Sequence, residues 1–296
     1  MTQTLGINHP SAQRLHSSAT MASSPTAREH LSEGTSSLSP LDQAAQLMPA
    51  ISLDELNALA ALQTRRDRKY ILSQDIATEL VAWLASMDSR EGARVLEIDG
   101  NRSSLYDSIY LDTPEMTCYR MAVQKNRRRF KVRRRTYMDS GQSFLEVKTK
   151  SASAQTVKDR VEWDALGTEQ RASEFIGECL APRVDADTLH LEPALRTRYR
   201  RTTIHLAASN MRLTIDQDLT WIAADGSATA HSDAVIVETK SPGHASHADR
   251  YLWAAGYRPL PSSKYAAGVA LFHPELPRER WTRTIDRYLK AVVDPH

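Results

Sequence analysis

The sequence predicts an α+β protein, mainly antiparallel β, in which the strands close into a tunnel-like β barrel and the helices pack outside. Three observations support this fold class. From residue 65 onward, most segments alternate polar and apolar side chains, which is the two-residue period of a strand with one buried face. Turn-forming residues separate these segments regularly, and few segments show helical spacing. A chain of 296 residues, 41% of them hydrophobic, can bury one large core.

The N-terminal segment differs in composition from the rest of the chain. Residues 1–40 are rich in Ser, Thr, Ala and Pro and poor in large apolar side chains, so burial cannot offset the entropy lost on ordering. We expect a disordered tail, although its Ser-rich composition with Arg14 and Arg28 also fits an organelle transit peptide. Residues 41–62 are expected to form a helical lead-in, and residues 63–296 the tunnel domain with a C-terminal helix.

Individual elements follow from the periodicity of the side chains. In the lead-in, Ser52 and Glu55 have the spacing of a capping box just after Pro49 interrupts the first helix. Helices are also expected at 75–87, 168–180 and 278–293, where apolar side chains recur at helical spacing. Strands are expected at 65–71, 104–111, 117–123, 129–138, 143–150, 157–164, 195–206, 210–219, 233–240 and 265–272.

Composition narrows the class of protein. Because 38 basic residues nearly balance 36 acidic ones, the net charge says little about function. The positions of the charged residues are more informative. Cys118 and Cys179 are the only cysteines, so a disulfide framework is not predicted. No apolar run approaches the roughly 20 residues that a membrane helix needs. We therefore expect a cytoplasmic protein without a membrane span.

Charged side chains share one face of several expected strands, because residues two apart point to the same side. These faces carry Arg65, Asp67 and Lys69; Lys131, Arg133 and Arg135; Glu146, Lys148 and Lys150; Arg212, Thr214, Asp216 and Asp218; and Glu238 with Lys240. An ordinary solvent-facing sheet would explain one such face. Five of them favour a lining that binds a polyanion, since Arg and Lys bind phosphate oxygens and isolated carboxylates bind the accompanying hard cation.

The densest basic run, 125–135, also fits a nucleic-acid patch. Phe130 is its only aromatic residue, and the carboxylates on the other charged faces would repel a nucleic-acid backbone. A second alternative concerns His244, His247 and Asp249, which could form a metal site. A polar loop or helix start is favoured there, because no further ligand is suggested. We expect neither nucleic-acid binding nor a histidine metal site.

An ordered series of motifs resembles a known family. The motifs are Arg65-Arg66-Asp67-Arg68-Lys69-Tyr70, Ser108-Ile109-Tyr110-Leu111-Asp112-Thr113, Lys131-Val132-Arg133-Arg134-Arg135-Thr136-Tyr137, Phe144-Leu145-Glu146-Val147-Lys148, Lys158-Asp159-Arg160, Tyr199-Arg200-Arg201, Arg212-Leu213-Thr214-Ile215-Asp216, Val237-Glu238-Thr239-Lys240 and Ser263-Lys264-Tyr265. Between Arg65 and Tyr265, this series resembles the VTC domain, or bacterial polyphosphate polymerase domain, of the triphosphate tunnel (CYTH-like) metalloenzyme superfamily.

The resemblance implies a triphosphate tunnel and a set of site residues. As catalytic residues it implies Arg133, Arg135, Lys148, Arg201, Arg212 and Lys264. As further phosphate-binding residues it implies Lys69, Lys131, Lys158, Arg160, Lys240 and Ser263. As ligands of a divalent Mn²⁺ or Mg²⁺ ion it implies Glu238 and Glu146.

The implied activity is a metal-dependent polyphosphate polymerase that uses ATP. Hydrolytic relatives open with a strand that carries two Glu and a Lys, whereas this chain has Arg65, Asp67 and Lys69. The single carboxylate weakens the case for a second metal that would activate water. A tripolyphosphatase or nucleoside triphosphatase, and a non-catalytic module that binds polyphosphate or tripolyphosphate, stay open as alternatives. Without membrane helices of its own, the chain would need a membrane partner to export a polymer.

Overall fold

The computed structural model describes residues 38–60, 66–87, 92–150, 156–181, 189–241 and 243–296. The expected disordered tail therefore lies almost wholly outside the described residues, as do Arg14, Arg28 and Arg65. Among the described residues, no helix has both the length and the apolar character needed to cross a membrane.

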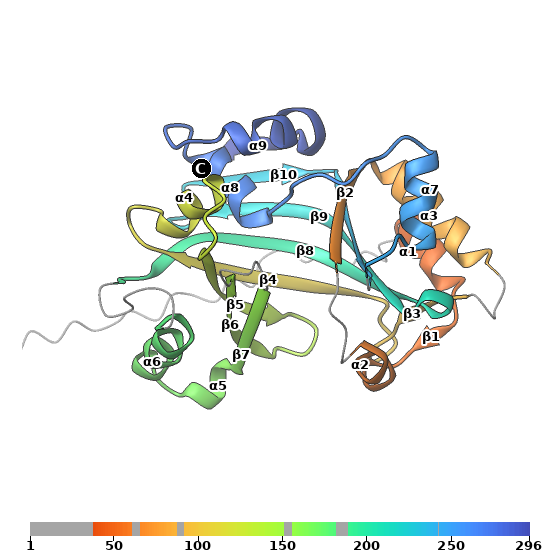
Figure 1. Cartoon of the computed structure of the whole chain (residues 1–296), viewed down its shortest axis with the longest axis horizontal. Helices are drawn as coiled ribbons and strands as arrows, with labels where there is room; N and C mark the ends of the chain where they lie inside the picture. Colours follow the sequence, from red (N-terminus) through yellow and green to blue (C-terminus); the bar gives the residue numbers. More distant parts are fainter. Residues whose placement is uncertain (1–37, 61–65, 88–91, 151–155, 182–188, 242) are drawn as a thin grey trace, which may run out of the picture. The chain divides into compact units, whose positions relative to one another are not determined.

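One sheet contains all the strands of the described chain (Figure 1). Its members are β1 (Ala50–Ile51), β2 (Arg66–Leu72), β3 (Ala93–Leu96), β4 (Ser103–Asp112), β5 (Phe130–Tyr137), β6 (Ser143–Lys150), β7 (Thr156–Glu162), β8 (Glu192–Leu206), β9 (Met211–Ala223), β10 (Ala228–Ser232), β11 (Val235–Ser241) and β12 (Val292–Pro295). The long path runs β12-β10-β9-β8-β4-β5-β6-β7, and β11 joins β9 to β2. Every pairing is antiparallel except β1 with β3.

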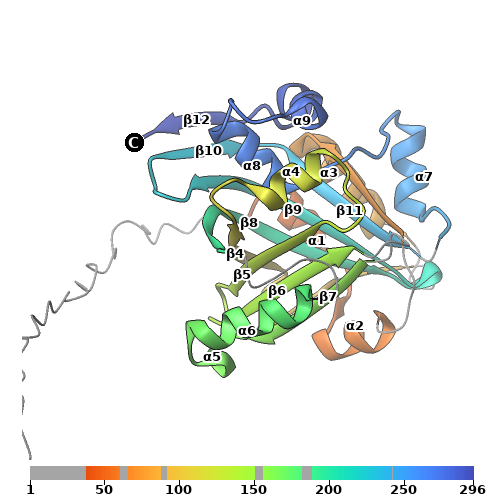
Figure 2. The same ribbon diagram turned by 60° about the vertical axis from the view of Figure 1, so that its left-hand side comes forward.

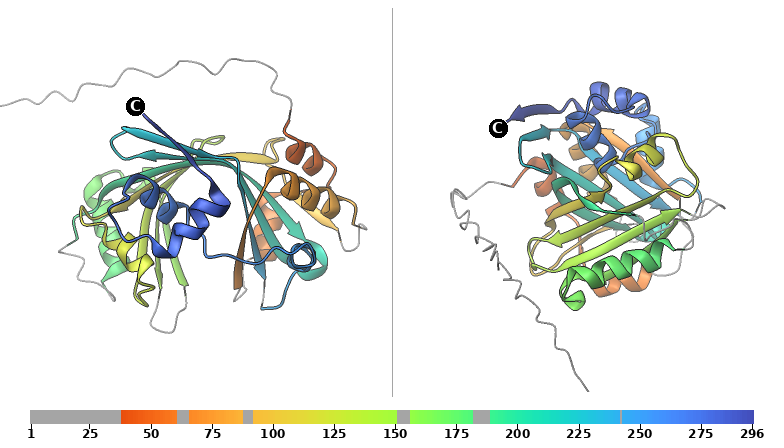
Figure 3. Two further views of the ribbon diagram at one scale, coloured as in Figure 1. Left: turned by 90° about the horizontal axis from the view of Figure 1, so that it is seen from above. Right: turned by 90° about the vertical axis from the view of Figure 1, so that its left-hand side faces the viewer.

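The sheet curls into a half-barrel, as the view from above in Figure 3 shows. Strands β2 and β7 each pair with one neighbour only, as do β1 and β12, and no pairing joins β2 to β7 within the described residues. The mainly antiparallel α+β class is thus confirmed, and closure of the barrel stays a prediction.

Helices lie on both faces of the sheet (Figure 2), so the prediction that they pack only outside it is wrong. They are α1 (Pro40–Gln46), α2 (Leu53–Ala60), α3 (Gln74–Ala85), α4 (Thr117–Val123), α5 (Trp163–Leu166), α6 (Glu169–Leu180), α7 (His247–Ala254), α8 (Lys264–Phe272) and α9 (Glu279–Arg283), with a 3₁₀ turn at Ala207–Ser209 and a π-helical turn at Thr284–Leu289. The capping box of the lead-in is present, because Ser52 N–H donates to Glu55 at 3.0 Å and Glu55 N–H to the Ser52 hydroxyl at 3.2 Å.

Two hydrophobic clusters use different side chains of the same strand. On β9, Leu213 and Ile215 belong to the cluster that includes buried residues of α1, α3 and α7. Leu219 and Trp221, farther along β9, belong to the cluster that includes the buried face of α8. The lead-in helix α1 therefore contributes to the core through Leu41 and its neighbours.

A β-bulge explains how β9 changes sides. Two residues of β9, Asp218 and Leu219, lie opposite the single residue Tyr199 of β8, and Asp218 has a left-handed φ of 55°. The strict alternation predicted for 210–219 is wrong at this point. Arg212, Thr214 and Asp216 alternate regularly and share one face of β9. The bulge removes Asp218 from this face and brings Leu219 to it.

Two segments that were predicted as strands are helices. Residues 265–272 lie in α8, and residues 117–123 form α4. The apolar run of α8 is buried almost all round, and such a run has no periodicity that separates a buried strand from a buried helix. For α4 the cause lies outside the segment: the Asp112 carboxylate at the end of β4 accepts hydrogen bonds from Cys118 N–H at 2.7 Å and Tyr119 N–H at 3.0 Å.

The predicted C-terminal helix is shorter than expected. After α9 the chain makes the π-helical turn to Leu289, and Lys290 then adopts a left-handed φ of 46° that ends the helix. Residues Val292–Pro295 form β12, which pairs with β10.

Candidate functional site

Alternation along β5 and β6 places the predicted cations and one predicted carboxylate on a common face. In the register of this pair, Arg133 lies opposite Glu146, and Lys131 lies opposite Lys148. Arg133 contacts Glu146 Oε2 through Nε at 2.7 Å, and Lys158 of β7 contacts Oε1 through Nζ at 2.6 Å. Although burial opposes its ionisation, these cations hold the pKa of Glu146 well below its usual range. Glu146 is therefore a buried counter-ion for cations on both neighbouring strands, β5 and β7.

A second ion cluster lies on β8 and β9. Arg201 binds Asp216 with two hydrogen bonds, of 2.5 Å to Oδ1 and 2.8 Å to Oδ2, and Lys264 at the start of α8 also contacts Oδ2. Asp216 is 1% exposed. Burial disfavours its charge, but Arg201 and Lys264 lower the pKa of Asp216 well below the ordinary value. The arrangement holds a guanidinium and an ammonium group side by side.

The third cluster lies on β11 and β2. Glu238 lies opposite Lys69 in the antiparallel register, and Lys240 forms an ion pair with Glu238. Burial opposes ionisation of Glu238, yet Lys69, Lys240 and the more distant Arg201 hold its pKa well below normal. Lys69 Nζ also donates to the Ser262 carbonyl at 3.2 Å.

Lys131 forms no ion pair with any carboxylate of the described residues. Its Nζ donates to the Ser263 hydroxyl, the N-cap of α8, at 2.6 Å. Burial, together with the charges of Lys69, Lys148 and Arg133, lowers the pKa of Lys131 to about 8. Lys148 is exposed, although protein surrounds it on most sides, and this environment and Lys69 lower its pKa as well. The cations of the β5–β6 wall and Lys69 of the β2–β11 wall are therefore close enough for their charges to interact.

Tyrosines complete the lining. Arg135 is buried, donates to the Tyr199 hydroxyl at 2.8 Å and lies 5.1 Å from the Tyr106 ring centroid. Arg133 Nη1 donates to the Tyr110 hydroxyl at 3.2 Å. Burial of Tyr110 opposes its ionisation, but Arg133, Arg135 and Lys131 lower its pKa to about 8. Tyrosine rings thus lie within cation–π distance of Arg133 and Arg135.

The structure brings most of the predicted site residues together. The ion pairs, hydrogen bonds and electrostatic couplings described above join Lys69, Lys131, Arg133, Arg135, Glu146, Lys148, Lys158, Arg201, Glu238, Lys240, Ser263 and Lys264. Arg160 lies opposite Glu146 and 4.4 Å from the Phe144 ring centroid. Arg212 lies opposite Lys240 in the β9–β11 register. Their roles stay predictions.

Sequence reasoning assigned no role to Asp216 or to the tyrosines. Asp216 shares the face of Arg212 in an Arg-x-Thr-x-Asp sequence, so its position was readable, but its pairing with Lys264 joins two distant segments. Tyr106 and Tyr110 lie four residues apart on β4 and therefore share one face of the strand. That spacing was the signal for them.

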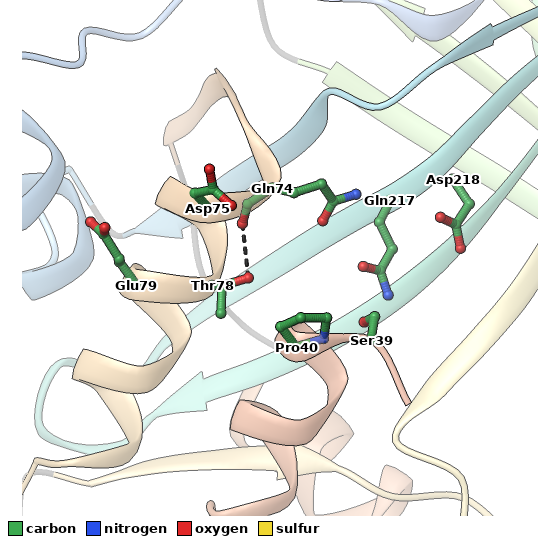
Figure 4. A pocket seen from close by; sticks show the side chains of 8 residues that line it. All are labelled: Ser39, Pro40, Gln74, Asp75, Thr78, Glu79, Gln217 and Asp218. Carbon is green, nitrogen blue, oxygen red and sulfur yellow. Dashed lines mark hydrogen bonds between the residues drawn. The ribbon is translucent and has the colours of Figure 1, made fainter. Parts of the chain in front are cut away.

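Two other candidate places do not resemble this lining. Asp249 caps α7 by accepting from Ser246 N–H at 2.7 Å and also accepts from Tyr70 and Thr239, so it acts structurally beside His247. A surface pocket of about 460 Å³ lies where α1 and α3 approach β9 (Figure 4). It is lined by Ser39, Pro40, Gln74, Asp75, Thr78, Glu79, Gln217 and Asp218, and it contains none of the predicted site residues.

Within the described residues, no group of three or more His, Cys, Asp or Glu side chains could by itself hold a metal ion. Glu146 and Glu238 are each in contact with cations. A divalent ion in this lining would therefore need phosphate oxygens as its main ligands, with a carboxylate in support. Mg²⁺ is commonly bound in this way in phosphoryl-transfer sites.

Comparison with solved structures finds distant neighbours. A candidate adenylate cyclase from Vibrio parahaemolyticus is 13% identical with a TM-score of 0.39, and the match covers 69% of this chain and 97% of that one. A candidate adenylyl cyclase from Hippeastrum, described as having a dominant triphosphatase activity, is 14% identical with a TM-score of 0.40 over 69% and 95% of the two chains. A conserved hypothetical protein from Pyrococcus furiosus is 10% identical with a TM-score of 0.34 over 65% and 88%. These scores are too low to carry an argument about activity.

Comparison of the sequence with families and with curated proteins gives one match. No curated protein matches the chain. The family model of the VTC domain matches residues 64–273, which include every charged strand of the lining. The chain belongs to the VTC domain family.

Proposed function

We propose that the protein is a metal-dependent polyphosphate polymerase that transfers the γ-phosphate of ATP onto a growing polyphosphate chain. The observation that supports this most directly is the excess of cations over carboxylates in the lining. Burial lowers the pKa of Lys131 and of Lys148, and the charges of Lys69 and Arg133 lower both further, which supports a positive potential in the lining. A linear phosphate polymer carries about one negative charge per unit and neutralises such a potential.

Phosphoryl transfer requires positioning and charge cancellation more than covalent chemistry by the protein. Arg133 and Arg201 lie on β5 and β8, so they can bind oxygens of one phosphate group from two walls. The terminal oxygen of the polymer attacks the γ-phosphorus, a new P–O bond forms, and the bond to the β-phosphate oxygen breaks. ADP leaves, and the polymer is one unit longer.

A divalent Mn²⁺ or Mg²⁺ ion, when bound, neutralises charge between phosphate oxygens. We propose Glu238 and Glu146 as its protein ligands. Each would have to release a cation, Lys240 in the first case and Arg133 or Lys158 in the second. Each released cation can then bind a phosphate oxygen, so it still has an anionic partner.

The same proposal includes closure of the barrel between β2 and β7. Its support is that the charge of Lys69 on β2 lowers the pKa of Lys148 on β6, the strand that pairs with β7. We also propose a cytoplasmic location, where ATP is available, and a membrane partner if the polymer is exported.

One experiment separates the proposed activity from its alternatives. The purified protein is incubated with ATP and Mn²⁺ or Mg²⁺, and the products are resolved on a gel that separates polyphosphates by length. Long chains are expected. Release of free phosphate without polymer would instead show a tripolyphosphatase or nucleoside triphosphatase, and binding without turnover would show a polyphosphate-binding module.

A further inference from the structure

Three cations continue the charged lining beyond its carboxylates. Arg129 lies immediately before β5, two positions before Lys131, and Lys150 follows Lys148 by two positions at the end of β6. The backbone hydrogen bond from Lys150 N–H to the Arg129 carbonyl, at 3.0 Å, extends the ladder between these strands. Arg280 of α9 completes the group, because the charges of Arg129 and Arg280 both lower the pKa of Lys150. We call Arg129, Lys150 and Arg280 the rim.

The rim differs from the lining in how its charges are compensated. Arg129 Nη1 donates to the Asn126 carbonyl at 2.8 Å, and Arg280 Nη1 donates to the Ala122 carbonyl at 2.5 Å. Among the described residues, no carboxylate forms an ion pair with any of the three. Partial burial and like-charge repulsion lower the pKa of Lys150 and of Arg280. The positive potential is therefore uncancelled here.

Exposed cations adjoin the rim. Lys125, Arg127 and Arg128 lie in the turn between α4 and β5, immediately before Arg129, and all three are exposed. The Nε–H group of Arg280 is buried and has no acceptor among the described atoms. A linear anion that leaves the lining past Lys131 would meet these charges next.

We infer that a linear polyphosphate chain runs from the lining across the rim, so that Arg129, Lys150 and Arg280 bind phosphate units beyond those held inside. The inference rests on the proposed function for the identity of the polymer. It adds that the protein binds long chains more tightly than tripolyphosphate, since a chain that extends past Lys131 gains the contacts at the rim.

Chemistry at the rim favours polyphosphate over a single-stranded nucleic acid. Nucleic-acid grooves of this kind combine cations with aromatic side chains on which bases stack. None of the exposed large hydrophobic side chains of the described residues is aromatic. Trp281 and Phe130, the aromatic neighbours of rim residues, are buried.

The test compares two ligands and two matched double variants of the full chain. The rim variant is Arg129→Gln with Lys150→Gln. The control variant is Arg250→Gln with Arg258→Gln, which removes the same charge from exposed arginines on or next to α7 that likewise donate to backbone carbonyls. Affinities for tripolyphosphate and for a long polyphosphate chain are measured by calorimetry, with thermal unfolding to confirm the fold.

For the rim variant we expect a loss of about tenfold or more in affinity for the long chain and a change of less than about twofold for tripolyphosphate. The slope of log affinity against log salt for the long chain should become shallower by about one to two. The control variant should bind both ligands as the wild type does.

Three outcomes would overturn the inference: equal losses for both ligands, equal losses in the control variant, or an unchanged affinity of the rim variant for the long chain. Displacement of the long chain by single-stranded RNA at equal charge concentration would overturn the assignment to polyphosphate. Wild-type binding of tripolyphosphate together with any of these results leaves the proposed function intact. A wild-type protein that binds neither ligand would contradict both.

Discussion

Glu146 accepts hydrogen bonds from the guanidinium group of Arg133, its direct neighbour across the β5–β6 ladder, while only 2% of the residue is exposed. Lys158 approaches the other carboxylate oxygen. Glu146 is therefore the buried counter-ion of two cations, and removing its charge leaves both of them uncompensated.

Glu146→Gln should destabilise the ligand-free protein, because Arg133 and Lys158 then repel each other without a counter-ion. We expect a loss of about 2–3 kcal/mol in the free energy of unfolding, measured by denaturant titration. Tripolyphosphate should restore much of this loss by supplying the missing charge. Glu275→Gln, which removes an exposed surface carboxylate, is the control and should change little. Equal stability of the two variants would contradict the counter-ion role.

Arg133→Ala should weaken binding of tripolyphosphate by about ten- to a hundredfold, since one charge-assisted contact contributes roughly 1.5–3 kcal/mol. The adjacent Arg134→Ala is the matched control. Arg134 points to the opposite face of β5, where its guanidinium lies 4.9 Å from the Trp163 ring centroid. Calorimetry should show an affinity within about twofold of the wild type for Arg134→Ala. Similar losses in both variants would mean that net charge, and not the lining, determines binding.

Glu238→Gln should leave the fold intact and abolish metal-dependent activity, because a neutral amide cannot compensate the charge of a hard cation. The measurement is polymer formation across a titration of Mn²⁺, with circular dichroism to verify folding. Full activity of this variant would remove Glu238 from the metal site.

Binding of tripolyphosphate should weaken as the pH rises through about 8. Lys131, whose pKa burial and neighbouring cations lower to about 8, loses its charge there, and Tyr110, with a pKa of about 8, gains a negative one. Both changes disfavour an anion. The double variant Lys131→Arg with Tyr110→Phe should lack this component, and calorimetry of both proteins between pH 7 and about 9.5 separates it from titration of the ligand itself.

Stability of the ligand-free protein should change in the opposite direction over the same range. In the unfolded chain Lys131 and Tyr110 keep their protons up to about pH 10, so between about pH 8 and 10 the unfolded state binds more protons than the folded one. The free energy of unfolding must then rise with pH in this window. If the free energy of unfolding instead fell over this range in the wild type but not in the double variant, the lowered pKa values of Lys131 and Tyr110 would be contradicted.

Gly268→Val should both destabilise the protein and weaken phosphate binding. A Cβ at this position would lie 2.4 Å from Trp221 Cδ1 and 2.6 Å from Leu195 Cδ2, so α8 must move away from the sheet. The cost should be about 1–3 kcal/mol. Because Ser263 and Lys264 lie at the start of α8, their contacts with Lys131 and Asp216 should loosen. Unchanged tripolyphosphate affinity in a measurably destabilised variant would show that the packing of α8 against Trp221 and Leu195 does not position Ser263 and Lys264.

Sequence alternation predicted the fold best where the two faces of a strand differ most. On β5 and β6, charged side chains oppose buried Val132, Leu145 and Val147, and the predicted bounds agree with the structure closely. Alternation failed in α8, where apolar and small residues fill every direction. It could not reveal that Asp112 caps α4, because this contact depends on where β4 ends in space.

The candidate site was predictable for the same reason and incomplete for another. The lining cations recur at two-residue spacing, so a single strand indicates their common face. Ion pairs such as Lys264 with Asp216 join segments 48 residues apart, and no local pattern records them. The resemblance to the VTC domain gave the order of the charged motifs along the chain. The structure gave the ion-pair partners of their side chains.

The bulge at Asp218 determines where the charged face of β9 ends. With unbroken alternation, Asp218 and Thr220 would follow Asp216 on the same face, and α8 would lose the apolar surface that Leu219 and Trp221 provide. One additional residue ends the polar face at Asp216 and continues it with Leu219 and Trp221, against which α8 packs. The length of the charged face on β9 is therefore set by a backbone insertion. Under the proposed function, moving that insertion by two residues would add or remove one phosphate-binding position.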